Sequence, residues 1–396
     1  MTAQRHFIEP LDVLFLRGNK LFGDPGSYGE SLVPPWPSVA AGALRSALLA
    51  HKGVDINAFA GGRFEDPELG TPERPGPFAL TLFNLARKTN NSNAPVEPLY
   101  PLPADLVVRK TDEEQAGTKG DGVKLCLERL RPRSPHGGIR SSRSTPLLAV
   151  LREHSRGKPE LGFWLRARGW KKYLEGETPT QNDLVKSGDL WQLETRVGVG
   201  LDAASRRAKD GALFSAQAVS LNKADKAEQG QQSGAVGFLA ETKGAAFPEN
   251  FALRLGGDGR AAIAGRVDAA LPTGDFDAIA KSRRCRLVLT SPGIFTSGWM
   301  PTGISSDGKF SLHGVSGTLS CAAVPRAEIV SGFDVAKRRP KTARRVAPTG
   351  SVYWLENLDA TPEALQNLTA QGLWSIEVED PSRRAEGFNR LAIAAY

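Results

Sequence analysis

The sequence has few of the residues that build disulfide frameworks, metal centres or nucleophilic active sites. Its 396 residues include five histidines and three cysteines, which are Cys126, Cys285 and Cys321. The cysteines are far apart and form no CxxC pair, so a zinc site or a disulfide framework is not predicted. No HExxH, GxxxxGK[ST] or GxSxG motif is present. We therefore predict no catalytic residue, no metal ion and no cofactor.

Long hydrophobic runs are missing as well. No uninterrupted apolar run reaches the ~18 residues that a membrane-spanning helix needs. The first ten residues, MTAQRHFIEP, contain no apolar segment of the kind found in signal peptides. These two absences predict a cytoplasmic protein that does not contact a membrane.

Positive charge, in contrast, is abundant. The chain has 51 Lys and Arg against 43 Asp and Glu, which gives a formal net charge of +8. Such an excess favours association with a polyanion, and nucleic acid is the first candidate. Charge of this kind indicates a partner rather than a fold.

The most informative stretch begins with an apolar run at residues 11–16, which predicts a strand. A basic, glycine-rich loop follows at 17–29, and three prolines then precede a helix predicted to begin at Ser38 or the proline before it. In this helix Ser38, Gly42 and Arg45 share one face, which is small, polar and basic, as a phosphate backbone would require. The alternative interpretation is a strand and its packing helix, with Arg45 solvated.

Two blocks in this stretch are similar to a known family. They are P-L-D-V-L-F-L-R from Pro10 and P-P-W-P-S-x(3)-G-A-L-R-S-A-L-L from Pro34. Both resemble the RAMP subunit that caps the 5′ end of the guide RNA in type III-B CRISPR (Cmr) effector complexes. Further similar segments follow in the same order: E-T-R-V-G-V-G-L-D at 194–202 with D-G-A-L-F at 210–214, L-G-G-D-G-R at 255–260, and R-R-V-A-P-T-G-S-V-Y at 344–353.

The resemblance implies a non-enzymatic subunit that holds the repeat-derived 5′ handle of the CRISPR RNA (crRNA). Its partners would be the crRNA, the large polymerase-like Cmr subunit and the first backbone RAMP subunit. One alternative is an endoribonuclease that processes repeat RNA, in which His136 would be the candidate general base. Another is the equivalent subunit of a type III-D complex.

The order of the predicted elements indicates an α+β fold with two ferredoxin-like (RRM-like) domains and long insertions, at residues 1–275 and 276–396. This is also the fold that the resemblance implies. Helices are predicted at 248–255 and 361–371. Strands are predicted at 78–85, 145–151, 161–166, 196–201, 213–219, 235–241, 261–267, 286–290, 318–330, 351–355 and 391–395. Polar stretches at 109–124, 175–183 and 223–234 are expected to be surface insertions of weak order.

RNA-backbone recognition needs Lys and Arg for phosphates and bare amides where the chain approaches closely. Basic runs at 129–143 and 337–345 and the glycine-rich loop at 255–260 meet these needs, although solvated surfaces and a tight turn are the alternatives. Phe22 and Tyr28 are loop candidates for stacking on bases. The predicted RNA-binding residues are Arg17, Lys20, Ser38, Gly42, Arg45, Arg140, Arg143, Arg196, Gly256, Gly257, Arg260, Arg338, Arg339, Lys341, Arg344 and Arg345.

Overall fold

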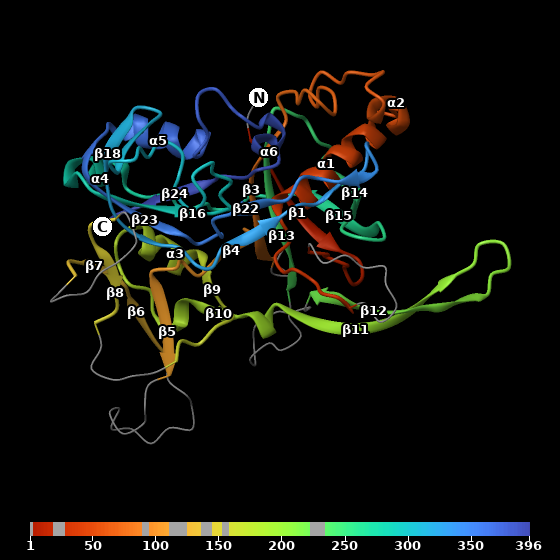
Figure 1. Ribbon diagram of the computed structural model, residues 1–396, viewed down its shortest axis with the longest axis horizontal. Coiled ribbons are helices and arrows are strands. Elements are labelled where there is room, and N and C mark those ends of the chain that lie inside the picture. The colour runs from red at the N-terminus through yellow and green to blue at the C-terminus, as the bar shows by residue number, and fades with distance from the viewer. Residues whose placement is uncertain are drawn as a thin grey trace.

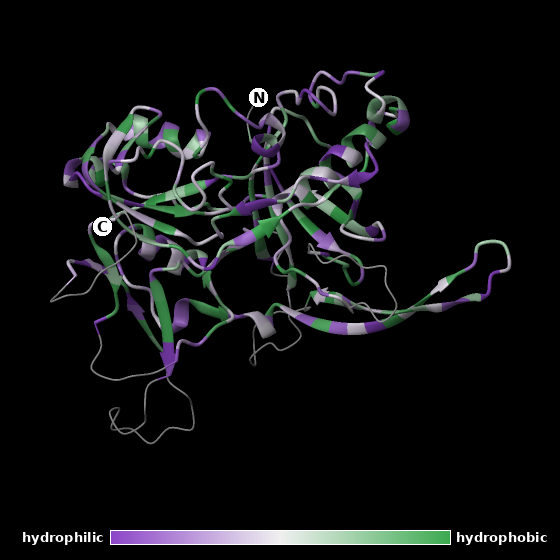
Figure 2. Ribbon diagram, viewed as in Figure 1, coloured by the Kyte–Doolittle hydropathy of each residue, from purple (hydrophilic) through white to green (hydrophobic). Residues whose placement is uncertain are grey.

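The computed structural model describes residues 3–18, 28–88, 95–110, 125–135, 145–152, 158–221 and 234–396. These residues form a mixed fold of helices and sheets, which agrees with the predicted α+β class. Two main sheets dominate it, and each has its own hydrophobic core (Figure 1). Hydrophobic residues occupy much of their strands (Figure 2).

The larger sheet has eight strands and belongs to the N-terminal half. Helix α1 (Pro37–His51) packs on it against strands β3 (Ala79–Lys88) and β14 (Asn250–Leu255). Ala40, Leu44 and Leu48 of α1 are buried in the same core as Ile8 and Phe238 of the sheet, because residues four apart share one helix face. The strand order is β10 (Leu184–Lys186), β9 (Phe163–Arg166), β4 (Glu97–Pro101), β3 (Ala79–Lys88), β13 (Ala235–Lys243), β1 (Gln4–Pro10), β15 (Arg260–Arg266) and β14 (Asn250–Leu255).

The smaller sheet has five antiparallel strands and belongs to the C-terminal half. Helices α4 (Phe276–Ser282) and α5 (Pro362–Gln371) contact each other and pack into its core. Thr361 caps α5 as predicted, since its side chain accepts a hydrogen bond from the Ala364 N–H at 3.2 Å. The strand order is β17 (Lys309–Leu312), β18 (Val315–Ala323), β23 (Val352–Asp359), β16 (Cys285–Leu289) and β24 (Leu391–Ala394).

A third buried cluster joins the two halves. It contains Tyr173 of α3 (Ala167–Leu174) and residues of the smaller sheet such as Trp354. At its centre the guanidinium of Arg286, 1% exposed, forms an ion pair with Asp105 at 2.7 Å, and the Tyr173 hydroxyl donates to the same carboxylate at 2.7 Å. Arg286 and Asp105 come from different halves of the chain, so this pair fixes one half against the other.

A long β-ribbon extends away from the two main sheets (Figure 1). It is formed by β11 (Trp191–Leu201) and β12 (Ala208–Leu221), and the short β2 (Tyr28–Gly29) pairs with β12 in parallel. Near its outer end Val197 and Leu213 are 71% and 60% exposed.

The remaining elements are short. They are α2 (Ile56–Ala60), α6 (Pro381–Ala385), the 3-10 helices η2 (Gln181–Asp183) and η3 (Ser187–Asp189), and the paired strands β5 (Leu106–Lys110) with β6 (Leu125–Arg129), β7 (Arg131–Arg133) with β8 (Leu148–Val150), β19 (Glu328–Val330) with β22 (Arg344–Val346), and β20 (Phe333–Asp334) with β21 (Arg339–Pro340).

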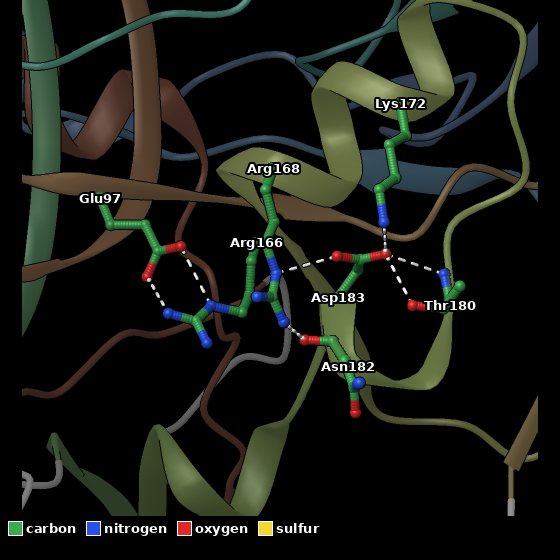
Figure 3. Close-up of polar contacts among 7 residues, drawn as sticks. All are labelled: Glu97, Arg166, Arg168, Lys172, Thr180, Asn182 and Asp183. Atoms are coloured by element: carbon green, nitrogen blue, oxygen red, sulfur yellow. Dashed lines mark hydrogen bonds and ion pairs between the residues drawn. The ribbon is translucent and has the colours of Figure 1, made fainter.

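The polar stretch 175–183 is held in place by the buried carboxylate of Asp183 (Figure 3). Asp183 forms ion pairs with Arg168 and Lys172 of α3, both at 2.9 Å, and accepts hydrogen bonds from the backbone N–H and hydroxyl of Thr180. Burial raises the pKa of this carboxyl, but the hydrogen bonds from Thr180 and Lys172 outweigh it and lower the pKa below its usual value. This segment is therefore anchored to α3 rather than loosely attached.

Two predicted elements are wrong. Residues 250–255, expected as part of a helix at 248–255, form β14, because Leu253 and Leu255 alternate with exposed residues and pair with β15. Residues 11–16 form no regular strand; Leu14 bridges to Val219 of the ribbon and Phe15 to Gly257, so the segment connects two elements. Strand β1 and helix α3 were not predicted.

The other predicted helices and strands are present with shifted ends. Helix α1 begins at Pro37 and α5 ends at Gln371, as expected. The predicted strand at 318–330 is two strands, β18 and β19, separated by residues 324–327. Of the insertions predicted at 109–124 and 223–234, residues 111–124 and 223–233 lie outside the described residues, and residues 109 and 110 belong to β5.

Candidate nucleic-acid interface

Three of the motif segments meet at the base of the ribbon. The Phe15 carbonyl accepts a hydrogen bond from the Gly257 N–H at 2.7 Å, and Leu14 exchanges two backbone hydrogen bonds with Val219 of β12, each at 2.8 Å. The side chain of Phe15 is buried in one cluster with Ala216 of β12. The segments around residues 10–17, 210–219 and 255–260 are thus one continuous structure, although more than 240 residues separate their ends.

Four predicted RNA-binding residues lie at this junction. The guanidinium of Arg260 lies 4.9 Å from the centre of the Phe15 ring, and its Nη1 is 3.4 Å from the Asp12 carboxylate. Arg17 Nη2 lies 3.5 Å from the carboxylate of Asp258, with both side chains about half exposed. Exposed pairs of this kind are weak, so both arginines can exchange a carboxylate for a phosphate.

The glycines of the loop are explained by close packing. Gly256 has a φ of +75°, and a Cβ atom there would lie 2.8 Å from the Phe15 carbonyl oxygen. The backbone N–H of Gly257 is used by the same carbonyl. The tight-turn interpretation therefore accounts for Gly256, and a direct phosphate contact by Gly256 or Gly257 stays a prediction.

The α1 face predicted to approach a phosphate is only partly open. Gly42 is exposed and Ser38 is half-buried. Arg45 turns back over the ring of Phe78, with its guanidinium carbon 5.3 Å from the ring centre. Burial lowers the pKa of Arg45, and the nearby charge of Glu386 partly opposes this. Arg45 therefore also contributes to packing, which periodicity alone did not indicate.

Arg196 lies on the ribbon. It is about half exposed and pairs with Glu194 on the same face of β11 at 3.2 Å. On that face the ring of Phe214 covers Gly198, since a Cβ at residue 198 would lie 2.4 Å from the ring. Gly198 of the motif at 194–202 is therefore needed because the ring of Phe214, on the paired strand β12, leaves no room for a side chain.

The second basic group lies in the C-terminal half. Arg338, Arg339, Arg344 and Arg345 are exposed around the paired strands β19–β22 and β20–β21. Lys341 differs from them because its ammonium bonds to the buried carboxylate of Glu386.

This second group meets the proline-rich motif that precedes α1. Trp36 is buried in one cluster with Val346 of β22, next to Arg344 and Arg345. Residues 34–37 and 344–349 therefore lie side by side, although about 300 residues separate them. The structure thus gathers the motif segments into two groups, one at the base of the ribbon and one at β22.

Several predicted residues lie outside the described part of the chain. These are Lys20, Phe22, His136, Arg140 and Arg143. The backbone of Tyr28 lies in β2, but its side chain is not described.

The described residues contain no group of three or more His, Cys, Asp or Glu side chains arranged to hold a metal ion. Among the same residues, none of the helices is both long enough and apolar enough to cross a membrane.

A feature that the sequence did not indicate is a cleft between the two halves. Its walls include residues 32–37 and 80–85 from the N-terminal half and residues 290–292 from the C-terminal half. Asn84 and Arg390 line it, and both are more than nine-tenths buried. No local pattern could have revealed this site, because its walls come from distant segments.

Comparisons with known proteins give a family. No curated protein matches the sequence. Among solved structures, the chain is similar to a chain in the cryo-EM structure of the Type III-B Cmr-beta bound to cognate target RNA, with a TM-score of 0.47, 14% identity, and 98% of this chain and 96% of that chain covered. For a chain of the Type III-B Cmr-beta bound to cognate target RNA and AMPPnP, state 1, the TM-score is 0.45, the identity 14% and the coverage 98% of each chain.

The model of one protein family, described as CRISPR-associated protein (Cas_Cmr3), matches residues 6–395. This match covers nearly the whole chain, including all the motif segments. The resemblance seen in those segments is therefore confirmed, and the chain belongs to the Cas_Cmr3 family of CRISPR-associated proteins.

Proposed function

We propose that this protein is a non-catalytic, RNA-binding subunit of a type III-B CRISPR (Cmr) effector complex, and that it holds the 5′ handle of the guide RNA. Its neighbours would be the large polymerase-like subunit and a backbone RAMP subunit, in the cytoplasm. Membership of the Cas_Cmr3 family supports the CRISPR context. The net charge of +8 supports a polyanionic partner.

One observation carries the proposal: the motif segments, far apart in sequence, are gathered into two basic groups. Arg17 and Arg260 lie in the first group, and Arg344 and Arg345 in the second. Arg260 packs over the ring of Phe15, but Arg17 and Arg260 both remain partly exposed, so they can still reach a bound phosphate. Positively charged side chains at the places where the motif segments meet could bind the phosphates of an RNA backbone.

We also propose that the chain consists of two ferredoxin-like halves, at residues 1–275 and 276–396. The smaller sheet has the order β18, β23, β16, β24, and within the larger sheet the order is β3, β13, β1, β15. Both correspond to the ferredoxin-like order, in which the first strand lies between the third and the fourth. The crossover helix α1 is present in the first half and α5 in the second, whereas β14 occupies the place of the other helix in the first half.

The experiment is a binding titration of the purified chain with fluorescent repeat-handle RNA, with and without divalent metal. We expect Arg17→Glu and Arg344→Glu each to weaken binding by about tenfold, since each charge reversal acts on a phosphate contact worth at least ~1.4 kcal/mol. Arg63→Glu, an exposed arginine outside both groups, is the matched control and should bind as the wild type does.

Two outcomes would contradict the proposal. Equal affinity of Arg17→Glu, Arg344→Glu and Arg63→Glu would place both groups outside the RNA footprint. Specific cleavage of the repeat RNA by the purified chain would favour the endoribonuclease instead.

A further inference from the structure

Two carboxylates lie beside the arginines at the base of the ribbon, and the four side chains are arranged reciprocally. The apolar segment at the N-terminal end supplies Asp12 and Arg17, and the glycine-rich loop supplies Asp258 and Arg260. Arg260 Nη1 lies 3.4 Å from the Asp12 carboxylate. Arg17 Nη2 lies 3.5 Å from the Asp258 carboxylate. Each segment therefore gives one cation and one anion, and each cation faces the anion of the other segment.

Stability does not explain these ion pairs. Both distances are longer than the ~2.7–2.9 Å of a strong charge-assisted hydrogen bond. The side chains of Asp12 and Asp258 are 61% and 54% exposed, and exposed ion pairs contribute little to the free energy of folding. The two segments are already joined by the hydrogen bond from the Gly257 N–H to the Phe15 carbonyl, 2.7 Å long. The aspartates can therefore be neutralised without unfolding the junction.

The backbone turn at Asp258 does not require a carboxylate either. Asp258 has a φ of +58°, and Gly259 follows it with a φ of +59°. In this left-handed region glycine is the least strained residue, and asparagine adopts the conformation as readily as aspartate does. An anion at residue 258 is thus explained by its charge rather than by the backbone conformation.

The carboxylates change how the two arginines respond to RNA. The four side chains carry two positive and two negative charges, so together they attract a distant polyanion only weakly. A phosphate that binds one of these arginines has to replace a carboxylate and then lie close to its negative charge, which repels it. Only an RNA held in place by further contacts gains enough to make both replacements.

We propose that Asp12 and Asp258 are specificity-determining residues, which occupy the two arginines in the free protein and release them only to RNA that fits the junction. The inference rests on the proposed RNA-binding function and deepens it, since it assigns the rejection of unrelated RNA to these carboxylates. Handle RNA contacts both arginines in the wild type. Unrelated RNA contacts them only when the carboxylates are neutralised.

The test is a pair of binding titrations with the full chain, one with fluorescent repeat-handle RNA and one with oligouridine of the same length. We expect Asp12→Asn/Asp258→Asn to bind oligouridine about tenfold more tightly than the wild type, because two cations become available to its phosphates. The affinity for handle RNA should rise by no more than about threefold, since only two weak ion pairs no longer compete. The ratio of the two affinities therefore falls.

The salt dependence of binding gives a second readout, which a change in folding alone would not produce. For oligouridine the plot of log affinity against log salt should be steeper in the double variant by about 1.4, the value for two phosphate contacts on a single strand. For handle RNA the slope should equal that of the wild type, because the same contacts are made before and after the substitutions.

The matched control is Asp307→Asn/Glu175→Gln, which changes the net charge by the same amount. Both residues lie in exposed ion pairs, Asp307 with Lys309 and Glu175 with Lys171. This control should bind both RNAs as the wild type does. Asp258→Gly, which suits the φ of +58°, should shift oligouridine binding as much as Asp258→Asn does, because both remove the carboxylate.

The outcomes separate this inference from the proposed function. Absence of handle-RNA binding by the wild type would overturn both. If the wild type binds handle RNA but the double variant gains equally for both RNAs, or gains no more than the control, this inference alone is overturned. Weaker binding of handle RNA by the double variant would show that the carboxylates position the arginines, and the inference would be wrong.

Discussion

Lowering the pH should destabilise the protein through a single buried histidine, His6 of β1. The side chain is fully buried in the larger sheet, and its ring lies edge-on to Phe247 and Phe251 at centre distances of 5.6 and 5.4 Å. Burial, assisted by the positive charge of Arg266, lowers the pKa of His6 from 6.5 to about 4, although the Pro248 carbonyl partly opposes this. The folded protein therefore holds His6 uncharged at neutral pH.

The sign and size of the effect follow from this pKa difference. Between pH 6.5 and pH 4 the unfolded chain binds a proton at His6 that the folded chain does not, so stability is complete above pH 6.5 and falls as the pH is lowered. The loss from pH 7 to pH 5 is about 2 kcal/mol, and it levels off near 3 kcal/mol below pH 4.

The assay is urea unfolding of the wild type and His6→Phe at pH 7 and pH 5. Other groups also titrate in this range, so the informative quantity is the difference between the two proteins. We expect the free energy of unfolding of His6→Phe to fall by about 2 kcal/mol less than that of the wild type. The exposed His51 is the control, and His51→Phe should follow the wild type. If the free energy of unfolding fell equally for His6→Phe and the wild type, the conclusion that the folded protein holds His6 uncharged would be wrong.

Three other substitutions test the remaining contacts. Asp105→Asn should lower the free energy of unfolding by ~3–5 kcal/mol, measured in urea, because it leaves the buried Arg286 without its counter-charge; a loss below 1 kcal/mol would contradict this. Arg260→Ala should flatten the plot of log affinity against log salt by about 0.7, one phosphate contact on single-stranded RNA, and an unchanged slope would place it outside the footprint. Arg45→Glu should lower the melting temperature as well as RNA affinity, since Arg45 packs over Phe78; an unchanged melting temperature would show that this packing contributes little.

Local signals correctly predicted where helices α1 and α5 begin. The prolines before residue 38 and the Thr361 cap fix backbone angles and satisfy free N–H groups within a few residues, so α1 and α5 begin where expected. Residues 250–255 were wrongly assigned to a helix because their local signals do not decide between a helix and a strand. A run of six residues is compatible with either a short helix or a strand, and only the neighbouring β15 decides between them.

In the candidate site, too, some features could be predicted from local sequence and others depend on the tertiary structure. The motif segments and their arginines can be recognised in the sequence. Periodicity placed Arg45 on one face with Ser38 and Gly42, but it could not show that Phe78, more than 30 residues away, draws the guanidinium inward. The need for glycine at residue 256 likewise depends on the carbonyl of Phe15, which only the folded chain brings within reach.

The sequence by itself determined the family, the basic character and the α+β class, because motif spelling, charge and hydrophobic alternation are properties of neighbouring residues. The tertiary structure decided which motif segments meet, which arginines remain exposed and where the cleft lies. These depend on contacts between residues hundreds of positions apart, such as the hydrogen bond from Arg390 to the Leu80 carbonyl. Such contacts form when the two halves pack around Arg286 and Asp105, and no local pattern contains them.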